Sequence, residues 1–198
     1  NFVEAKDHIV KLRDDDVSFL CKKLKRDKIV TMFGLDIVAE TPLAVAQKCQ
    51  QICAGVVLDD EGEKIFIHQL KADWAYEKFK GSRIAVLTGF KGEVDIFKRL
   101  PVSQTDDYLA FQRGEFQWFV GSWQRFARGV DLSSAEACII TSCPWSSEGL
   151  IQGRDRMLRK DRTIGAPVYF PVIEGGIDEK IYQIVAGEKR DFTAKQYL

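Results

Sequence analysis

The chain has 198 residues, of which 45% are apolar, so it is long enough for one large domain or two small ones around a substantial core. Its 29 basic and 29 acidic side chains cancel, which excludes a strong overall field but not a local basic face. No apolar run approaches the length of a membrane span, and no signal-peptide pattern occurs. We therefore expect a cytoplasmic, intracellular protein with no membrane partner.

The cysteines fall in apolar surroundings and are odd in number: Cys21, Cys49, Cys53, Cys138 and Cys143. The spacing Cys49-x-x-x-Cys53 suits a metal pair, but no second pair exists and both histidines are distant in the sequence. This pattern predicts buried free thiols in a reducing compartment and no metal site.

The N-terminal part of the chain predicts a helix and then a hairpin. Apolar residues at helical spacing predict a helix over 17–25, and two β-rich runs around Gly34 predict a hairpin over 28–38. Thr41-Pro42 is a capping residue followed by a first-turn proline, which starts a helix that should stop at Gly55. We expect residues 1–41 to form an N-terminal helix and hairpin segment, and residues 42–198 to form the main domain.

An acidic turn, Asp59-Asp60-Glu61-Gly62, separates two further β-rich runs and predicts a second hairpin. An apolar strand that ends in carboxylates also resembles the magnesium-binding acids of an NTPase. That alternative requires a phosphate loop upstream, and no Gly-x-x-x-x-Gly-Lys-Ser/Thr sequence occurs in the chain. An independent NTPase that uses Asp59 to Glu61 is therefore the weaker interpretation.

From Leu70 onward, predicted helices and strands alternate. The expected strands are 83–88, 116–120, 137–141 and 167–172, and the expected helices are 72–79, 92–100, 123–127, 148–158 and 177–186. This rhythm predicts an α/β fold, with right-handed crossovers and a mostly parallel sheet covered by helices on both faces. Ligands of such sheets bind at the carboxyl ends of the strands, so we expect the loops after Thr88, Val120 and Thr141 and before Asp131 to open onto the site.

The helix predicted over 148–158 carries the most specific chemical pattern. Gln152, Arg156 and Arg159 are spaced four and three apart, so they share one helical face. Neighbouring guanidiniums repel unless an anion or carboxylates lie opposite, and the planar fork of arginine binds two oxygens of a phosphoryl group. The alternative is a solvated, charge-rich helix, since Arg154 and residues 160–162 are also charged.

Two further features precede or follow the buried run at 137–140. Gly129 allows close approach of the backbone to a ligand, and Asp131 can accept from a ribose hydroxyl or hold an arginine. The alternative is an ordinary tight turn before a strand. Trp145 lies in a loop at the predicted functional edge and could stack on a base, with packing at the rim of the core as the alternative.

Together and in this order, these motifs resemble the second RecA-like lobe of superfamily 2 helicases, with Swi/Snf-type and phage-encoded DNA helicases as the nearest likeness. Residues 83–91, RIAVLTGFK, resemble motif IV, and residues 127–133, ARGVDLS, resemble motif V. Residues 152–159, QGRDRMLR, resemble motif VI in its Gln-x-x-Asp-Arg-x-x-Arg form. Residues 50–68 resemble the helix and hairpin that lead into this lobe in phage members. The likeness covers most of residues 42–187 and implies a RecA-like fold.

The resemblance also implies roles for individual residues. Arg156 and Arg159 would be arginine fingers that reach ATP held on a first lobe. The residues implied at the nucleotide are Gly129, Asp131 and Gln152. The residues implied at the sugar-phosphate backbone of a strand are Thr88, Gly89, Phe90, Lys91 and Ser122, with Trp145 at the same edge.

The partners implied are single- or double-stranded DNA, with RNA as the alternative, and a first RecA-like lobe on the same or a separate chain. That lobe would carry the phosphate loop and hold ATP and Mg²⁺, so we expect no ATPase activity from this chain alone. Residues 160–162 replace the Gly-Gln usual after the last arginine of Swi/Snf proteins. Motif V is equally close to DEAD-box RNA helicases, whereas Gln152 and Asp155 depart from their His-Arg-x-Gly-Arg motif VI. The alternatives are the second lobe of a DEAD-box-like RNA helicase and a non-catalytic RecA-like module that binds nucleic acid or protein.

Overall fold

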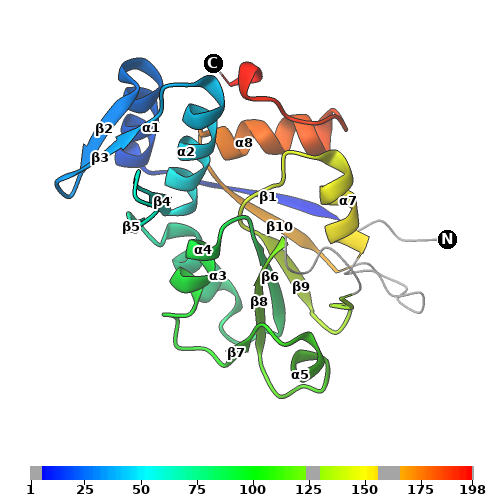
Figure 1. The fold of residues 1–198 in the computed structure, drawn as a ribbon. Coiled ribbons are helices and arrows are strands. Elements are labelled where there is room, and N and C mark those ends of the chain that lie inside the picture. The colour runs from blue at the N-terminus through cyan, green and yellow to red at the C-terminus, as the bar shows by residue number, and fades with distance from the viewer. Residues whose placement is uncertain (1–5, 124–129, 156–165, 198) are drawn as a thin grey trace.

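A six-stranded, wholly parallel sheet forms the centre of the computed structural model, which describes residues 6–123, 130–155 and 166–197 (Figure 1). In spatial order the strands are β1 (Asp7–Leu12), β10 (Val168–Ile173), β9 (Ala137–Ile140), β6 (Ile84–Thr88), β8 (Trp118–Ser122) and β7 (Gln104–Thr105). Every residue of β6 and β9 is buried, which is typical of parallel strands covered on both faces. The prediction of an α/β fold with a mostly parallel sheet is confirmed.

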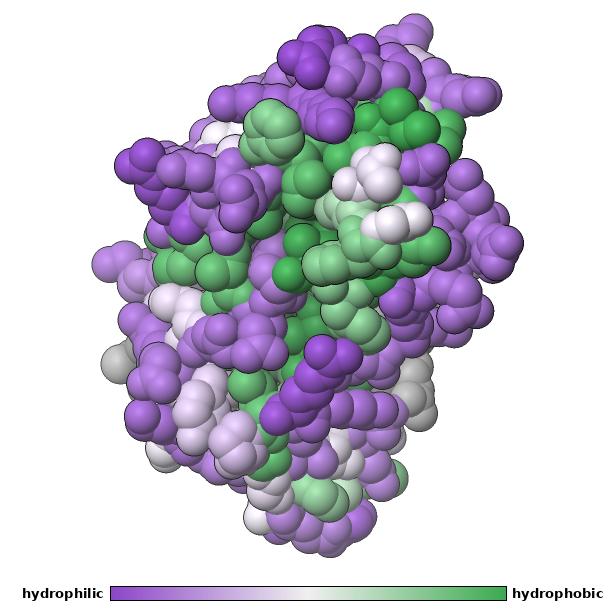
Figure 2. Space-filling view, turned by 90° about the vertical axis from the view of Figure 1, so that its left-hand side faces the viewer, coloured by the Kyte–Doolittle hydropathy of each residue, from purple (hydrophilic) through white to green (hydrophobic). Residues whose placement is uncertain are grey.

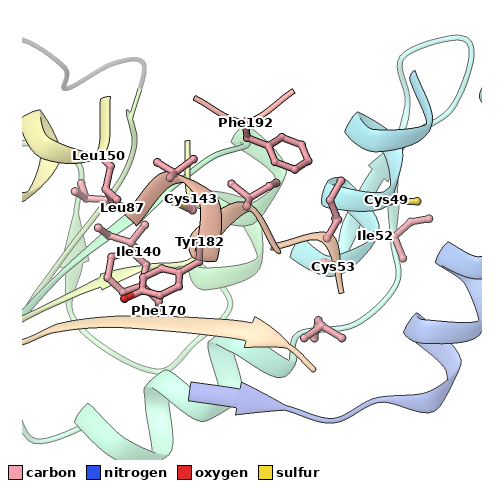
Figure 3. Packing of buried hydrophobic residues seen from close by; sticks show 14 of the residues in the cluster. Cys49, Ile52, Cys53, Leu87, Ile140, Cys143, Leu150, Phe170, Tyr182 and Phe192 are labelled. Atoms are coloured by element: carbon pink, nitrogen blue, oxygen red, sulfur yellow. The ribbon is translucent and has the colours of Figure 1, made fainter. Parts of the chain in front are cut away.

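One face of the sheet carries the larger part of the core. Alternate strand residues such as Leu87, Ile140 and Phe170 point to this face. They share one buried cluster with Leu150 and, further along it beside Cys49 and Cys53, with Ile52 (Figure 3). The helices that contribute to this cluster are α1 (Asp15–Asp27), α2 (Pro42–Ala54), α5 (Tyr108–Gln112), α7 (Ser147–Asp155) and α8 (Ile177–Tyr182), followed by the π-helix η1 (Gln183–Gly187).

The opposite face is covered by two helices, α3 (Leu70–Phe79) and α4 (Lys91–Phe97). Val86 and Ile139 point to this face from neighbouring strands, and Ala75 and Phe97 pack against them. The 2-residue alternation of the strands therefore supplies both halves of the core. Within the described ranges, no helix has the length and apolar composition needed to cross a membrane.

The N-terminal segment adds an edge strand that the sequence patterns did not predict. β1 runs parallel to β10, from the pair Asp7↔Val168 to the pair Leu12↔Ile173. The predicted helix and hairpin then follow as α1, β2 (Ile29–Met32) and β3 (Leu35–Val38). Leu24 of α1 is fully buried in the main core. Residues before position 42 therefore contribute both a strand and a helix to the central architecture.

Local capping chemistry sets the limits of α2. The Thr41 hydroxyl oxygen accepts from the Ala44 N–H at 3.1 Å, and Gly55 ends the helix with φ of 92°. The Gly55 N–H donates to the carbonyls of Gln51 and Ile52, as at a glycine C-cap. The predicted start and stop of this helix are confirmed.

The acidic turn at 59–62 joins β4 (Val56–Leu58) to β5 (Lys64–Phe66) as the predicted hairpin. Asp59 Oδ1 accepts from the Glu61 and Glu63 N–H groups at 2.9 and 2.8 Å. This carboxylate therefore serves the turn itself. Near the C-terminus, residues 194–196 form the short 3₁₀ helix η2 (Ala194–Gln196).

Candidate functional site

Three loops begin side by side at one edge of the sheet, where parallel strands end (Figure 1). Thr88, the last residue of β6, is the register partner of Ser122 at the end of β8, and Leu87 is the partner of Ile140 in β9. The Trp123 indole N–H donates to the Ser142 carbonyl at 3.1 Å, which joins the loops after β8 and β9. The carboxyl edge predicted from the alternation is therefore where the motif IV residues gather.

The β6 loop, residues 88–91, is fixed mainly by inward contacts. Thr88 is fully buried, and its hydroxyl lies 3.3 Å from the Phe90 carbonyl and 3.5 Å from the Gly121 carbonyl. Gly89 and Phe90 are half-buried, whereas Lys91 is exposed. A Cβ added to Gly89 would meet the Ser142 Cβ at 2.7 Å, so the loop packs directly against the loop after β9. Of the four residues, only Lys91 presents an exposed side chain.

Glu93, which the sequence patterns did not single out, holds this loop from inside. Its side chain is buried, and Oε2 accepts from the Gly89 N–H at 2.8 Å and the Phe90 N–H at 3.0 Å. Oε1 accepts from the Ser142 hydroxyl at 2.9 Å. Burial raises the pKa of the Glu93 carboxyl, against the lowering effect of Lys71 and of the hydroxyls that donate to it.

A buried ion pair continues this polar cluster beneath the loops. Lys71 of α3 lies 2.8 Å from Asp178 of α8, and both side chains are almost wholly excluded from solvent. The ammonium also donates to the Thr141 carbonyl at 2.5 Å. Burial alone would lower the pKa of Lys71, but Asp178 and Glu93 outweigh it and raise that pKa, so the ammonium stays charged.

Trp145 belongs to the rim of the core. Its indole N–H donates to Gln50 Oε1 at 2.8 Å, and its ring meets the Phe192 ring edge-on with centroids 5.1 Å apart. Gln50 is itself buried and donates to the Cys143 carbonyl at 3.0 Å. The packing alternative raised for Trp145 matches this arrangement, which engages both its polar and apolar parts.

Of the residues predicted at the nucleotide, the described ranges contain Asp131 and Gln152. Gln152 is exposed on α7 and donates to Glu148 at 3.0 Å. Asp131 accepts from the Ser133 N–H at 2.8 Å, and its carbonyl accepts from Gln112 of α5 at 3.0 Å. This places Asp131 beside α5. Gly129, Arg156 and Arg159 lie outside the described residues, as does most of the helix predicted over 123–127.

Arg154 also has a partner that its place in a charged run did not predict. It forms an ion pair with Asp7 of β1, and the Tyr182 hydroxyl donates to the same carboxylate at 2.9 Å. Its guanidinium carbon lies 5.7 Å from the centre of the Phe170 ring. These contacts tie α7 to the edge strand and to α8.

The prediction of buried free thiols is confirmed, since all five cysteines are buried and unbridged. Among the described residues, no group of three possible metal ligands occurs, and the carboxylate of Asp59 is occupied by its own turn. The alternative of an independent NTPase with its metal at residues 59–61 stays a prediction.

Comparisons with known proteins agree with this architecture. The family described as "Helicase conserved C-terminal domain" matches residues 51–161, and no curated protein matches the chain. The crystal structure of the C-terminal part of the Fun30 ATPase domain is 17% identical with a TM-score of 0.50, covering 66% of this chain and 48% of that one. The Pyrococcus furiosus Hef helicase domain is 17% identical with a TM-score of 0.43, covering 58% and 26%. The chain spans about half of the Fun30 structure, whose likeness confirms the RecA-like α/β fold.

Proposed function

The chain belongs to the helicase conserved C-terminal domain family, and from that premise we propose that it is the second lobe of an ATP-dependent DNA helicase or translocase. The observation that carries the proposal is the extent of the match, residues 51–161. This range includes residues 83–91, 127–133 and 152–159, which resemble motifs IV, V and VI. Motif VI in its Gln-x-x-Asp-Arg-x-x-Arg form favours a Swi/Snf-type or phage-type enzyme over a DEAD-box one.

In this proposal ATP and Mg²⁺ are held by a first lobe that carries the phosphate loop. The support is chemical, because this sequence has no phosphate loop and its described residues offer no cluster of metal ligands. Arg156 and Arg159 would stabilise charge on the transferring phosphoryl group, with Gly129, Asp131 and Gln152 near the nucleotide.

The proposal assigns contact with a nucleic-acid backbone to the carboxyl edge of β6 and β8. Lys91 is exposed there, and Ser122 ends the neighbouring strand at the same level as Thr88. The N–H groups of Gly89 and Phe90 already donate to Glu93, so the Lys91 ammonium is the group best placed to meet a phosphate.

An ATPase assay of the isolated chain tests the division of labour between lobes. With Mg²⁺ and single-stranded DNA present, we expect no turnover, because phosphate-loop amides and the loop lysine supply most nucleotide affinity. Robust turnover that disappears in Asp60→Asn would contradict the proposal and restore the independent NTPase.

A salt titration of strand binding tests the nucleic-acid edge. We expect weak binding without sequence preference, and Lys91→Ala should reduce the slope of log affinity against log salt by about one. Lys98→Ala is the matched control, since Lys98 is exposed at the other end of α4. An unchanged slope in Lys91→Ala, or an equal change in Lys98→Ala, would remove Lys91 from the binding groove.

A further inference from the structure

A buried charged side chain at the carboxyl edge, bonded through both of its oxygens, is one for which the motifs give no role. Glu93 lies in the first turn of α4, and only 1% of its surface is exposed. Both carboxylate oxygens accept hydrogen bonds, from two N–H groups of the β6 loop and from the Ser142 hydroxyl. One buried carboxylate thus ties the loop after β6 to the loop after β9.

These bonds determine the conformation of the β6 loop. Glu93 is the third residue of α4, and its carboxylate reaches back to the N–H groups of Gly89 and Phe90, the two residues before the helix. A hydrogen bond to a charged acceptor is stronger than a neutral one, and loss of a buried partner leaves each N–H unsatisfied. Without Glu93, Gly89 and Phe90 would have to turn toward solvent.

Neighbouring groups offset part of the cost of burying the Glu93 carboxyl. Burial raises the pKa of the Glu93 carboxyl, and Lys71, which is itself buried and paired with Asp178, offsets part of that rise. A charged group excluded from water is destabilising unless it is paired and hydrogen-bonded. Glu93 meets the second condition through both carboxylate oxygens, although an apolar side chain at its position would fill the same space more simply.

We propose that Glu93 is a positioning residue for nucleic-acid binding: it holds the β6 loop against Ser142 so that Lys91 faces a strand backbone. The inference rests on the proposed function, since it requires Lys91 to contact nucleic acid. Glu93 itself touches no phosphate, because it is buried and its carboxylate would repel one. It acts on affinity through the geometry of the loop.

The test measures binding of a fluorescently labelled oligo-dT strand by the chain and five variants. Glu93→Ala removes all three hydrogen bonds, and we expect affinity to fall about tenfold, because the loop would then adopt the binding-competent conformation only part of the time. Glu93→Gln should bind nearly as the parent does, because its amide oxygen can accept from the two N–H groups and its NH₂ can donate to Ser142. Leu24→Ala controls for lost stability, since Leu24 is fully buried in α1 on the other face of the sheet.

The double variant Glu93→Ala/Lys91→Ala distinguishes positioning from general destabilisation. If Glu93 acts through the loop, Lys91→Ala should weaken binding in the parent but have little further effect once Glu93 is alanine. Additive losses, or an equal loss in Leu24→Ala, would overturn the inference. If Lys91→Ala binds the strand more weakly than the parent but Glu93→Ala does not, the inference about Glu93 is overturned while the proposed function stands. No strand binding by the parent would overturn both.

Discussion

Replacement of Lys71 by methionine should be among the most destabilising single changes in the chain. Lys71 and Asp178 are 2.8 Å apart, with side-chain exposures of 3% and 2%. Methionine fills much of the same volume but leaves Asp178 buried without its cation. Removal of one partner from a buried pair costs about 3–5 kcal/mol. For a domain of this size that corresponds to about 6–20 °C in Tm.

Urea denaturation of Lys71→Met, monitored by tryptophan fluorescence, measures this loss. Lys64→Met is the matched control: Lys64 pairs with Asp95 at 2.5 Å, but with side-chain exposures of 40% and 37%. An exposed pair contributes at most about 1 kcal/mol. Adding Asp178→Asn to Lys71→Met should recover part of the loss, because it removes the uncompensated charge. Equal unfolding midpoints for Lys71→Met and Lys64→Met would refute the reasoning.

Three further changes test local features of the fold. Gly55→Ala should destabilise the fold by about 2 kcal/mol or more in a thermal melt, because φ is 92° and the added Cβ would overlap the His68 carbonyl. Gly81→Ala is the control and should be nearly neutral, since the space around Gly81 is open. Thr41→Ala should lower unfolding free energy in urea by about 1 kcal/mol through loss of the N-cap, and no change would contradict that cap. Burial lowers the pKa of His68, so the unfolded chain binds the proton first as the pH falls below about 6.5. Stability should therefore decrease from that pH down to the folded pKa, and His68→Gln should flatten this dependence if the sign is right.

Local signals predicted those elements whose chemistry is local. Thr41-Pro42 and Gly55 bracket α2 because a cap, a first-turn proline and a positive-φ glycine act on the backbone within a few residues. The runs in β6 and β9 consist almost wholly of apolar residues, so the sequence also predicted these buried parallel strands. The sequence did not predict β1, because this strand forms by pairing with β10, which lies near the other end of the chain.

In the candidate site, too, the sequence predicted some features and missed others. The motifs predicted which strand ends gather at one edge, because parallel strands share that edge. They did not predict that Thr88 faces inward, since its hydroxyl lies near the Gly121 carbonyl of the neighbouring strand. The bonds from the Gly89 and Phe90 N–H groups to Glu93 span only four and three residues, so a glutamate in the first turn of the predicted helix was a local signal that could have revealed them. Arg154, by contrast, finds Asp7 at a separation of 147 residues, which no local pattern encodes.

The most direct test of the account is the DNA-stimulated ATPase activity of the chain joined to a first lobe that carries a phosphate loop. We expect Arg156→Ala and Arg159→Ala each to reduce turnover by about a thousandfold or more while the fold and DNA binding are kept. Lysine at either position should not restore activity, because a point charge cannot reproduce the bidentate fork. Near-normal turnover in both alanine variants would contradict the assignment of these arginines and leave the helicase mechanism without its second-lobe contribution to ATP hydrolysis.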